Sequence, residues 1–133
     1  MRYLLDTDTC VFALRGSEPV RERLGVVDSE AVAISVITLA ELRYGAACSA
    51  RPEANHQVVG DFVSGIIILG LADQIAHLFG EFKAQLRRRG ALIDDFDLLI
   101  AATAHHHRLT LITHNLEHFH CIPELQVEDW VRA

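Results

Sequence analysis

Short apolar runs alternate along the chain with longer segments whose apolar residues recur at helical spacing. The runs predict strands at Arg2–Asp6, Ala31–Ser35, Ile66–Leu71, Leu109–Thr113 and, more briefly, Gln126–Val127. The longer segments predict helices at Cys10–Leu14, Val20–Val27, Leu39–Cys48, Pro52 to near Gly65, Asp73–Gly90 and Asp95–His107. Strands that alternate with helices pair in parallel through right-handed crossovers. The pattern predicts a three-layer α/β/α sandwich with a central parallel sheet of four to five strands, as a single domain over residues 1–133.

The segment Ile93–His107, IDDFDLLIAATAHHH, joins three carboxylates to a strongly apolar helix. Asp94, Asp95 and Asp97 fall just before or inside the first turn, where the helix macrodipole favours negative charge. The residues after Asp97 are apolar nearly all round, which is typical of a buried helix. A charge at the mouth of a buried helix needs a partner or a metal ion, because an unpaired buried charge is costly. The carboxylates of this segment therefore either only stabilise the start of the helix or include a functional acid.

Four oxygen-bearing side chains fall where strands of the predicted sheet end. Asp6 closes the first strand, and Glu41 lies in the first turns of the helix after the second. Asp97 begins the helix that leads into the fourth strand, and Asn115 follows that strand. Open α/β sheets bind ligands at the carboxyl ends of their strands, and oxygen ligands suit Mg²⁺ or Mn²⁺. We therefore expect these four residues to be catalytic and to bind the metal, Asp6 and Asp97 directly and Glu41 and Asn115 directly or through water.

Each of these residues has a structural alternative that the sequence leaves open. Asp6 could cap the following helix, and Asp97 could simply complement the macrodipole. Ser35 or Thr38 could cap the helix that carries Glu41, and Glu41 follows Thr38 at the spacing of a capping box. Asn115 could stabilise a turn. Three further carboxylates are expected to cap helices, to face solvent or to support the site from outside it: Asp8, Asp94 and Asp95.

The composition narrows the class of protein. The chain is 50% hydrophobic and 23% charged, which indicates a globular rather than a disordered protein. No apolar run is long enough to span a bilayer and no signal peptide is evident, so we expect a cytoplasmic location without membrane contact. Cys10, Cys48 and Cys121 are widely separated, which indicates buried thiols in a reducing compartment. The net charge of −6 argues against a broad basic face, although every cation except Lys83 is Arg, a bias that suits phosphate recognition.

Five stretches, taken together and in order, resemble the PIN-domain ribonucleases, specifically the VapC toxins of prokaryotic toxin–antitoxin systems. They are YLLDTDTCVF, ISVITLAELRYGA, IDDFDLLIAATA, LTLITHNLEHF and IPELQVEDW, and they span essentially the whole chain. By position, Asp6, Glu41 and Asp97 match the catalytic acids of the family. Asn115 falls where members carry Asp or Asn, and Asp8 replaces an Asn that the family usually has.

The resemblance implies an α/β/α sandwich, usually a homodimer, and an Mg²⁺- or Mn²⁺-dependent endoribonuclease. It also implies a structured RNA substrate such as a tRNA, and neutralisation by a cognate VapB-type antitoxin. The chemistry agrees, because a metal held by Asp6 and Asp97 would activate a water molecule that Glu41 orients or deprotonates. Hydrolysis would leave a 5′-phosphate and a 3′-hydroxyl. The candidate phosphate contacts are Arg43, Arg87, Arg88, Arg89 and Arg108, although the run of three arginines is more typical of a solvated helix end.

Three other functions compete with this hypothesis. A haloacid-dehalogenase-like phosphatase would use Asp6 as its nucleophile, but Lys83 lies in mid-helix, away from any strand end. A catalytically silent PIN-like binding module would be expected to have lost acids that this chain keeps. A metal-independent ribonuclease would use histidines, which gather in the last third of the chain: His105, His106, His107, His114, His118 and His120.

Overall fold

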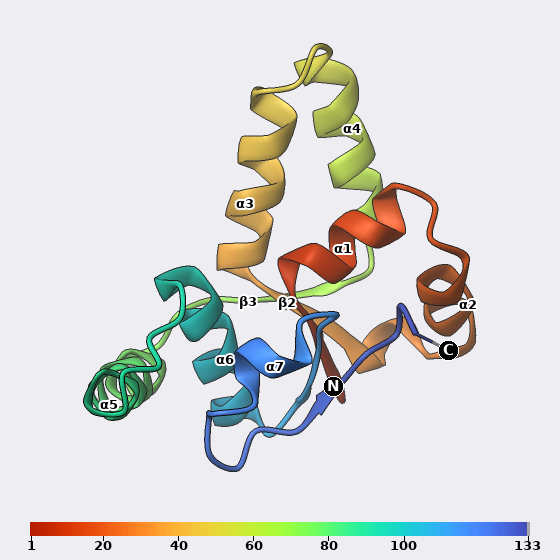
Figure 1. Ribbon diagram of the computed structural model, residues 1–133. Coiled ribbons are helices and arrows are strands. Elements are labelled where there is room, and N and C mark those ends of the chain that lie inside the picture. Colours follow the sequence, from red (N-terminus) through yellow and green to blue (C-terminus); the bar gives the residue numbers. More distant parts are fainter. Residues whose placement is uncertain (133) are drawn as a thin grey trace.

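A sheet of parallel strands forms the middle of the molecule (Figure 1). The computed structural model describes residues 1–132. The strands are β1 (Tyr3–Leu5), β2 (Val32–Ser35), β3 (Ile67–Leu69), β4 (Thr110–Ile112) and β5 (Val127–Glu128). They form one 5-stranded sheet in the order β3-β2-β1-β4-β5. Because β1 lies between β2 and β4, the residues that follow these three strands share one edge of the sheet, which we call the carboxyl edge.

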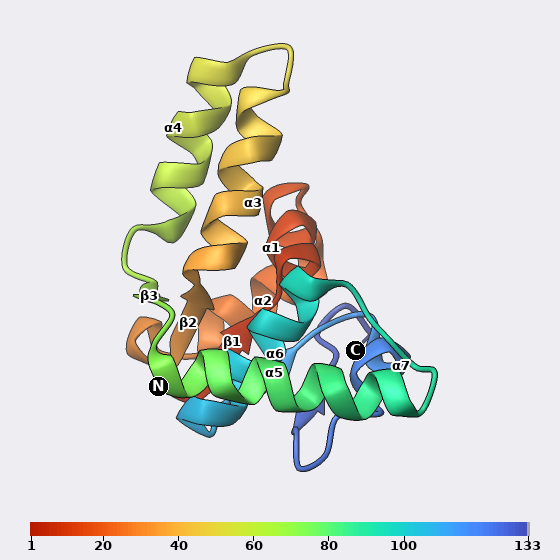
Figure 2. The same cartoon turned by 90° about the vertical axis from the view of Figure 1, so that its left-hand side faces the viewer.

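Helices cover both faces of this sheet (Figures 1 and 2). One face carries α1 (Thr7–Leu14), α2 (Glu18–Val26), α3 (Val36–Ala47) and α4 (Pro52–Val63). The other face carries α5 (Asp73–Arg88), α6 (Asp95–His107) and α7 (Leu116–Phe119). A short 3₁₀ helix, Ser29–Ala31, precedes β2. The predicted three-layer α/β/α sandwich with a central parallel sheet is confirmed.

Alternate residues of the strands enter two hydrophobic cores, one on each face of the sheet. Leu4 and Leu111 belong to the core beneath α5 and α6. The core on the other face includes Tyr3, Leu5, Cys10, Val20, Ile34 and Trp130. Helix α6 is an integral part of the first core, since Leu98 and Ile100 are completely buried. Full burial of one such side chain stabilises the fold by about 1.5–3 kcal/mol, so the start of α6, which carries Asp97, is held firmly in place.

Local capping sets where the helices beside the carboxyl edge begin. The Ser35 hydroxyl accepts a hydrogen bond from the backbone N of Ile37 (3.0 Å), so α3 starts at Val36, earlier than predicted. Thr38 is therefore inside the helix and buried, and Glu41 lies in the second turn. The capping box considered for Thr38 and Glu41 is wrong, because Ser35 already occupies the capping position.

The connection from α5 to α6 brings the carboxylates of α6 to the same edge. Gly90, just past the end of α5, has φ +67°, a left-handed conformation that costs glycine little. The Asp94 side chain then caps α6, because its Oδ2 accepts a hydrogen bond from the backbone N of Phe96 (3.1 Å). The predicted helix Asp95–His107 is confirmed in both its boundaries.

Other features differ from the sequence prediction. Helix α7 was not predicted, because four residues are too few to show a periodicity. The three cysteines are free, but Cys48 is exposed, so the prediction of buried thiols is wrong for this residue. Within residues 1–132, none of the helices is long and apolar enough to cross a bilayer. Ala133 lies outside the described residues, and a single domain over residues 1–133 stays a prediction.

Candidate active site

Asp6 lies where β1 ends and is only 3% exposed. Its Oδ1 accepts a hydrogen bond from the backbone N of Thr9 (2.8 Å), so Asp6 caps α1, which starts at Thr7 rather than at Cys10. Burial raises the pKa of Asp6, although hydrogen bonds from the side chain of Thr113 and from Thr9 act in the opposite direction. The capping role is therefore present. A buried carboxyl with a raised pKa is also typical of a functional acid.

Glu41 reaches the same edge from α3. The hydroxyl of Thr7 donates a hydrogen bond to Glu41 Oε1 (2.6 Å) and is also hydrogen-bonded to the hydroxyl of Thr38 (3.2 Å). Since Thr7 directly follows Asp6, these bonds join the start of α1 to α3. A cleft of about 320 Å³ opens here between α1, α3 and α4, and Thr7 and Glu41 line it. One hydroxyl thus orients the Glu41 carboxylate at the mouth of a cleft.

Asp97, in the first turn of α6, has a strongly perturbed carboxyl group. Its pKa is raised to about 6, chiefly by burial. The charges of Asp94, Asp6 and Glu41 also raise the pKa of Asp97, whereas the nearby His118 lowers it. The carboxyl of Asp97 is therefore within electrostatic range of Asp6 and of Glu41. The structure therefore brings together acids from three separate segments of the chain.

Asn115 is connected to these acids through a histidine. Its backbone N donates a hydrogen bond to the hydroxyl of Thr113 (3.0 Å), which agrees with the turn role considered from the sequence. Its side-chain Nδ2 is hydrogen-bonded to Nδ1 of His118 (2.8 Å), which leaves Nε2 of that ring free to face the acids. That Nε2 lies 3.7 Å from Oδ2 of Asp97. Asn115 therefore reaches Asp97 through the His118 ring.

His118 also belongs to this site, although the sequence analysis named it only among the histidines of a metal-independent ribonuclease. Its Nε2 is buried and has no hydrogen-bond partner within the described part of the chain, a state that normally needs an explanation. The signal in the sequence was the three-residue separation of Asn115 and His118, which places both on one side of a helix. That signal was hidden because the short helix α7 was not predicted.

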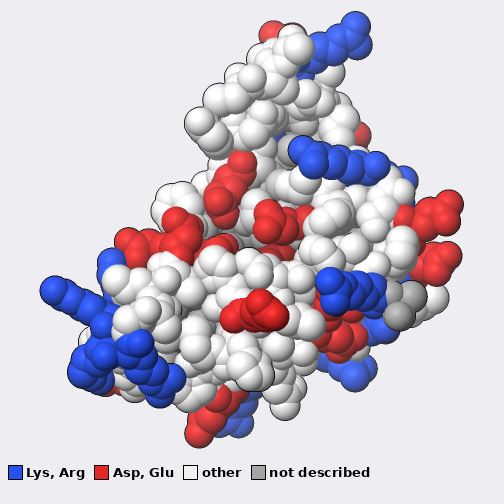
Figure 3. Space-filling model, in the orientation of Figure 1, with Lys and Arg blue, Asp and Glu red and all other residues white. Residues whose placement is uncertain are grey.

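Figure 3 shows several acidic side chains gathered in the middle of one face of the molecule, near the place where α1, α3 and the start of α6 approach one another (Figure 1). Within residues 1–132, no three His, Cys, Asp or Glu side chains are close enough together, as they stand, to hold a metal ion. The donors nevertheless fit a divalent cation chemically. They are oxygens, and burial and like charge raise the pKa of both Asp6 and Asp97, which a bound cation would counteract.

The three further carboxylates lie around this site. Asp94 caps α6, Asp8 is exposed in the first turn of α1, and Asp95 forms an ion pair with Lys83 of α5 (2.9 Å). A phosphatase that used Asp6 as nucleophile would need a lysine beside that residue. Since Lys83 pairs with Asp95 instead, the geometry does not favour this alternative.

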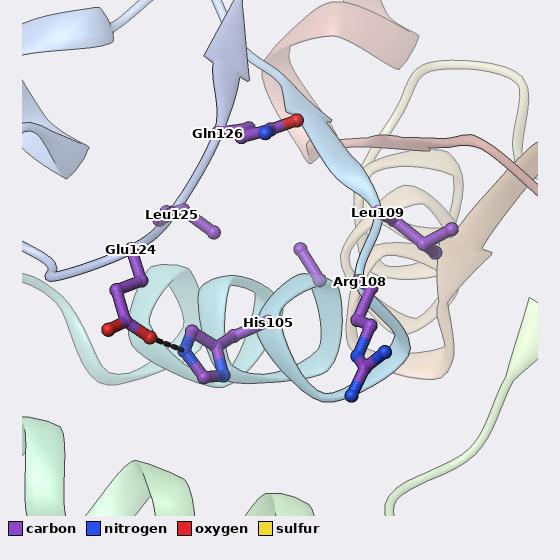
Figure 4. A pocket seen from close by; sticks show the side chains of 7 residues that line it. His105, Arg108, Leu109, Glu124, Leu125 and Gln126 are labelled. Atoms are coloured by element: carbon purple, nitrogen blue, oxygen red, sulfur yellow. Dashed lines mark ion pairs between the residues drawn. The ribbon is translucent and has the colours of Figure 1, made fainter.

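The histidine triplet lies at the opposite edge of the sheet, which we call the amino edge. There Nε2 of His105 is 4.0 Å from Oε2 of Glu124, and the His105 ring meets Phe82 edge-on. With Arg108 and Gln126, these two ionisable residues line a pocket of about 380 Å³ (Figure 4). The 13 residues of α6 span roughly 20 Å. The triplet is therefore remote from Asp97, at the other end of the same helix.

Comparison with known proteins agrees with this fold and site. The family model of the PIN domain matches residues 3–123. The chain is 39% identical to the tRNA(fMet)-specific endonuclease VapC of Salmonella typhimurium, with 98% of each chain covered. It is 35% identical to ribonuclease VapC2 of Rickettsia felis, again with 98% of each chain covered.

Two solved structures are very similar to this one. The DNA-bound VapBC of Salmonella typhimurium contains a chain with a TM-score of 0.93 and 38% identity, covering 98% of both chains. VapBC2 of Rickettsia felis, bound to a DNA fragment from their promoter, gives a TM-score of 0.91 and 34% identity, covering 98% of this chain and 99% of that one. The chain therefore belongs to the PIN domain family. Within that family its relatives are VapC ribonucleases, which confirms the resemblance seen in the sequence.

Proposed function

We propose that this chain is the toxin of a toxin–antitoxin pair and acts as a metal-dependent endoribonuclease. The observation that carries the proposal is the meeting of Asp6, Glu41 and Asp97 at the carboxyl edge, where the pKa of Asp97 is raised to about 6. Perturbed carboxyl groups that gather beside a cleft are typical of catalytic sites. Membership of a family whose relatives are named as ribonucleases supports the same reaction.

In this proposal Asp6 and Asp97 hold Mg²⁺ or Mn²⁺, and Glu41 and Asn115 reach the ion directly or through water. Such an ion, when bound, makes an attacking water more acidic and offsets negative charge on the phosphate. Asn115 also holds the ring of His118, which faces Asp97. His118 is thus well placed to keep the Asp97 carboxylate oriented.

Glu41 is the candidate base. Thr7 fixes one of its oxygens, and the half-buried carboxylate can orient a water molecule and take its proton. The water oxygen forms a bond to phosphorus while the bond from phosphorus to the 3′ oxygen breaks. The departing 3′ oxygen takes up a proton from solvent water, so the products are a 5′-phosphate and a 3′-hydroxyl.

The substrate we propose is a structured RNA such as a tRNA, because the Salmonella relative is named for action on tRNA(fMet). The partner we propose is a VapB-type antitoxin, since the similar solved structures are VapBC assemblies. A homodimer and a cytoplasmic location stay predictions from the family resemblance and from the composition.

The experiment that tests the proposal is cleavage of total RNA by protein freed of any antitoxin by denaturation and refolding. Wild type is assayed with Mg²⁺ or Mn²⁺ and with chelator, beside Asp97→Asn and the neighbouring control Asp95→Asn. We expect discrete, metal-dependent cuts with 5′-phosphate ends for wild type and for Asp95→Asn, and their loss in Asp97→Asn.

Two outcomes would contradict the proposal. Cleavage that resists chelator and leaves cyclic phosphate ends would move the chemistry to the histidines. Absence of cleavage in refolded, antitoxin-free protein would favour the silent binding module.

A further inference from the structure

Three consecutive arginines, Arg87, Arg88 and Arg89, end α5 and form a basic cluster that the proposed chemistry does not use. All three are exposed. Within residues 1–132 none of them forms an ion pair, and the contact the structure gives them is a hydrogen bond from Nη1 of Arg89 to the carbonyl of Cys121 (3.2 Å). The helix macrodipole favours a cation in the last turn, but it does not require three adjacent like charges. We call these residues the arginine cluster.

The arginine cluster lies beside the acidic site. Lys83 of α5 is 2.9 Å from Asp95 at the start of α6, and Arg87 follows Lys83 by one helical turn, about 6 Å along the axis. Figure 3 shows basic side chains gathered over this end of α5 on the same face as the acidic patch. Figure 2 shows the same end of α5 close to α7, which carries His118. The cluster and the candidate active site therefore share one face.

Some other cations of the chain have a side-chain or carbonyl partner. Arg23 pairs with Glu128 (2.6 Å), and Lys83 pairs with Asp95. Arg43 donates to the carbonyl of His56 (2.8 Å). On a protein of net charge −6, the arginine cluster is thus a local excess of positive charge that no acidic side chain of residues 1–132 pairs with.

A polyanion needs a local excess of positive charge near this acidic site in order to bind there. The acids at the carboxyl edge repel phosphate groups, and a repulsive patch slows the association of a charged ligand. Exposed arginines nearby can offset that repulsion by binding phosphates bidentately with their planar guanidinium groups. Such arginines would bind the phosphate backbone of the polyanion. They would therefore contribute affinity and fix its position, without distinguishing one base sequence from another.

We propose that the arginine cluster binds the phosphate backbone of the RNA on the α5 side of the active site, next to the scissile bond. This inference rests on the proposed ribonuclease function and adds to it a specific substrate-binding surface. Arg87 and Arg88 are the principal contacts, because Arg89 is already held by Cys121. The competing occupant, an acidic segment of an antitoxin, is tested below.

The test is RNA binding in an Asp97→Asn background, with unfractionated tRNA as the probe and a salt titration. The variant Arg87→Gln/Arg88→Gln is compared with Arg2→Gln/Arg51→Gln, which removes the same charge before β1 and before α4, away from α5. Loss of two phosphate contacts lowers the slope of log K against log salt by about 1.5, and we expect roughly tenfold weaker binding near 0.15 M salt. This control variant should keep the wild-type slope and stay within about twofold in affinity, since only general electrostatics change.

Cleavage by the same two double variants with Asp97 restored separates binding from chemistry. We expect KM to rise by about tenfold for Arg87→Gln/Arg88→Gln while kcat stays within about twofold, because the interaction is the same in the ground and transition states. Equal KM values and equal salt slopes for the two double variants, with an active wild type, would overturn the arginine-cluster proposal alone.

Normal tRNA binding together with weakened binding of a co-expressed antitoxin would also overturn it, and would assign the cluster to the partner. An inactive wild type would instead contradict the ribonuclease proposal itself, so the two failures are distinguishable.

Discussion

At the carboxyl edge of the sheet a cleft of about 320 Å³ opens beside Thr7 and Glu41, and at the amino edge a pocket of about 380 Å³ opens beside His105 and Glu124. The two hollows are similar in volume, so size does not distinguish them. Their charges do. At the carboxyl edge several acids lie around Asp97 beside one histidine, His118, whereas at the amino edge one histidine faces one carboxylate (Figures 3 and 4).

The difference shows where the fold tolerates electrostatic cost. Like charges close together raise their own pKa and destabilise the protein whenever they are ionised. A histidine beside a carboxylate carries no such cost. The acids gathered at the carboxyl edge cost stability, so their presence indicates a function at that edge. The pair of His105 and Glu124 at the amino edge needs no explanation beyond its contribution to the structure.

The largest expected contrast is in cleavage rate. Asp6→Asn keeps the cap of α1, because Asn caps helices as well as Asp does, but it removes a charge from the site. We expect single-turnover cleavage of tRNA with Mn²⁺ to slow by about 10³-fold, against less than twofold for Glu124→Gln at the amino edge. Similar cleavage rates for Asp6→Asn and Glu124→Gln would show that the carboxyl edge and the amino edge do not differ in function.

A smaller contrast comes from two matched threonine substitutions. Thr7→Val removes the hydroxyl that orients Glu41, and loss of a hydrogen bond to a charged group costs about 1.5 kcal/mol or more, roughly tenfold in rate. Thr110→Val removes a hydroxyl that lies 3.4 Å from Gln126 Oε1 at the amino edge, and cleavage should stay within about twofold. Initial rates measured in parallel compare them. A Thr7→Val enzyme as fast as Thr110→Val would show that Glu41 needs no orientation.

Stability should change in the opposite direction to activity. The pKa of Asp97 is raised from 3.8 to about 6 in the folded chain, so the folded state binds this proton more tightly than the unfolded state. Ionised Asp97 therefore destabilises the fold above about pH 6, and the penalty disappears as pH falls towards 4. In chelator at pH 7.5, Asp97→Asn should raise Tm by about 3–5 °C, on the order of 1 kcal/mol, and at pH 4 the gain should vanish.

Thermal melts with added Mn²⁺ complete this comparison. The ion should raise the Tm of wild type, because it binds the native state only, and should raise that of Asp97→Asn much less. A variant less stable than wild type at pH 7.5 would mean that Asp97 stabilises the fold instead of straining it.

The smallest expected effect lies at the amino edge. Glu124 has φ +59°, a left-handed conformation that favours glycine. Its carboxylate is largely exposed and 4.0 Å from His105, so the ion pair contributes little. Glu124→Gly should therefore stabilise the protein by about 0.5–1 kcal/mol and leave cleavage unchanged. Chemical denaturation measures the first and the tRNA assay the second; a large loss in either would give this pocket a role.

The sequence by itself predicted most of the elements, because they follow from local properties. A capped apolar run gave the boundaries of α6, and Pro52 gave the start of α4. Parallel topology then placed Asp6 at the same edge as the residues that follow β2 and β4. The exceptions were local too: α7 was too short to show a period, and of the two candidate caps of α3, Ser35 and Thr38, the structure has Ser35.

The properties of the site were decided only by the tertiary structure. The pKa of Asp97 depends on its burial and on charges carried by β1 and α3, and the part of His118 depends on its distance from α6. The sequence also left open whether the arginines of α5 face the acids or the opposite side. Each of these depends on distances between segments remote in the chain, and electrostatic energy varies with those distances and with burial, neither of which a linear pattern contains.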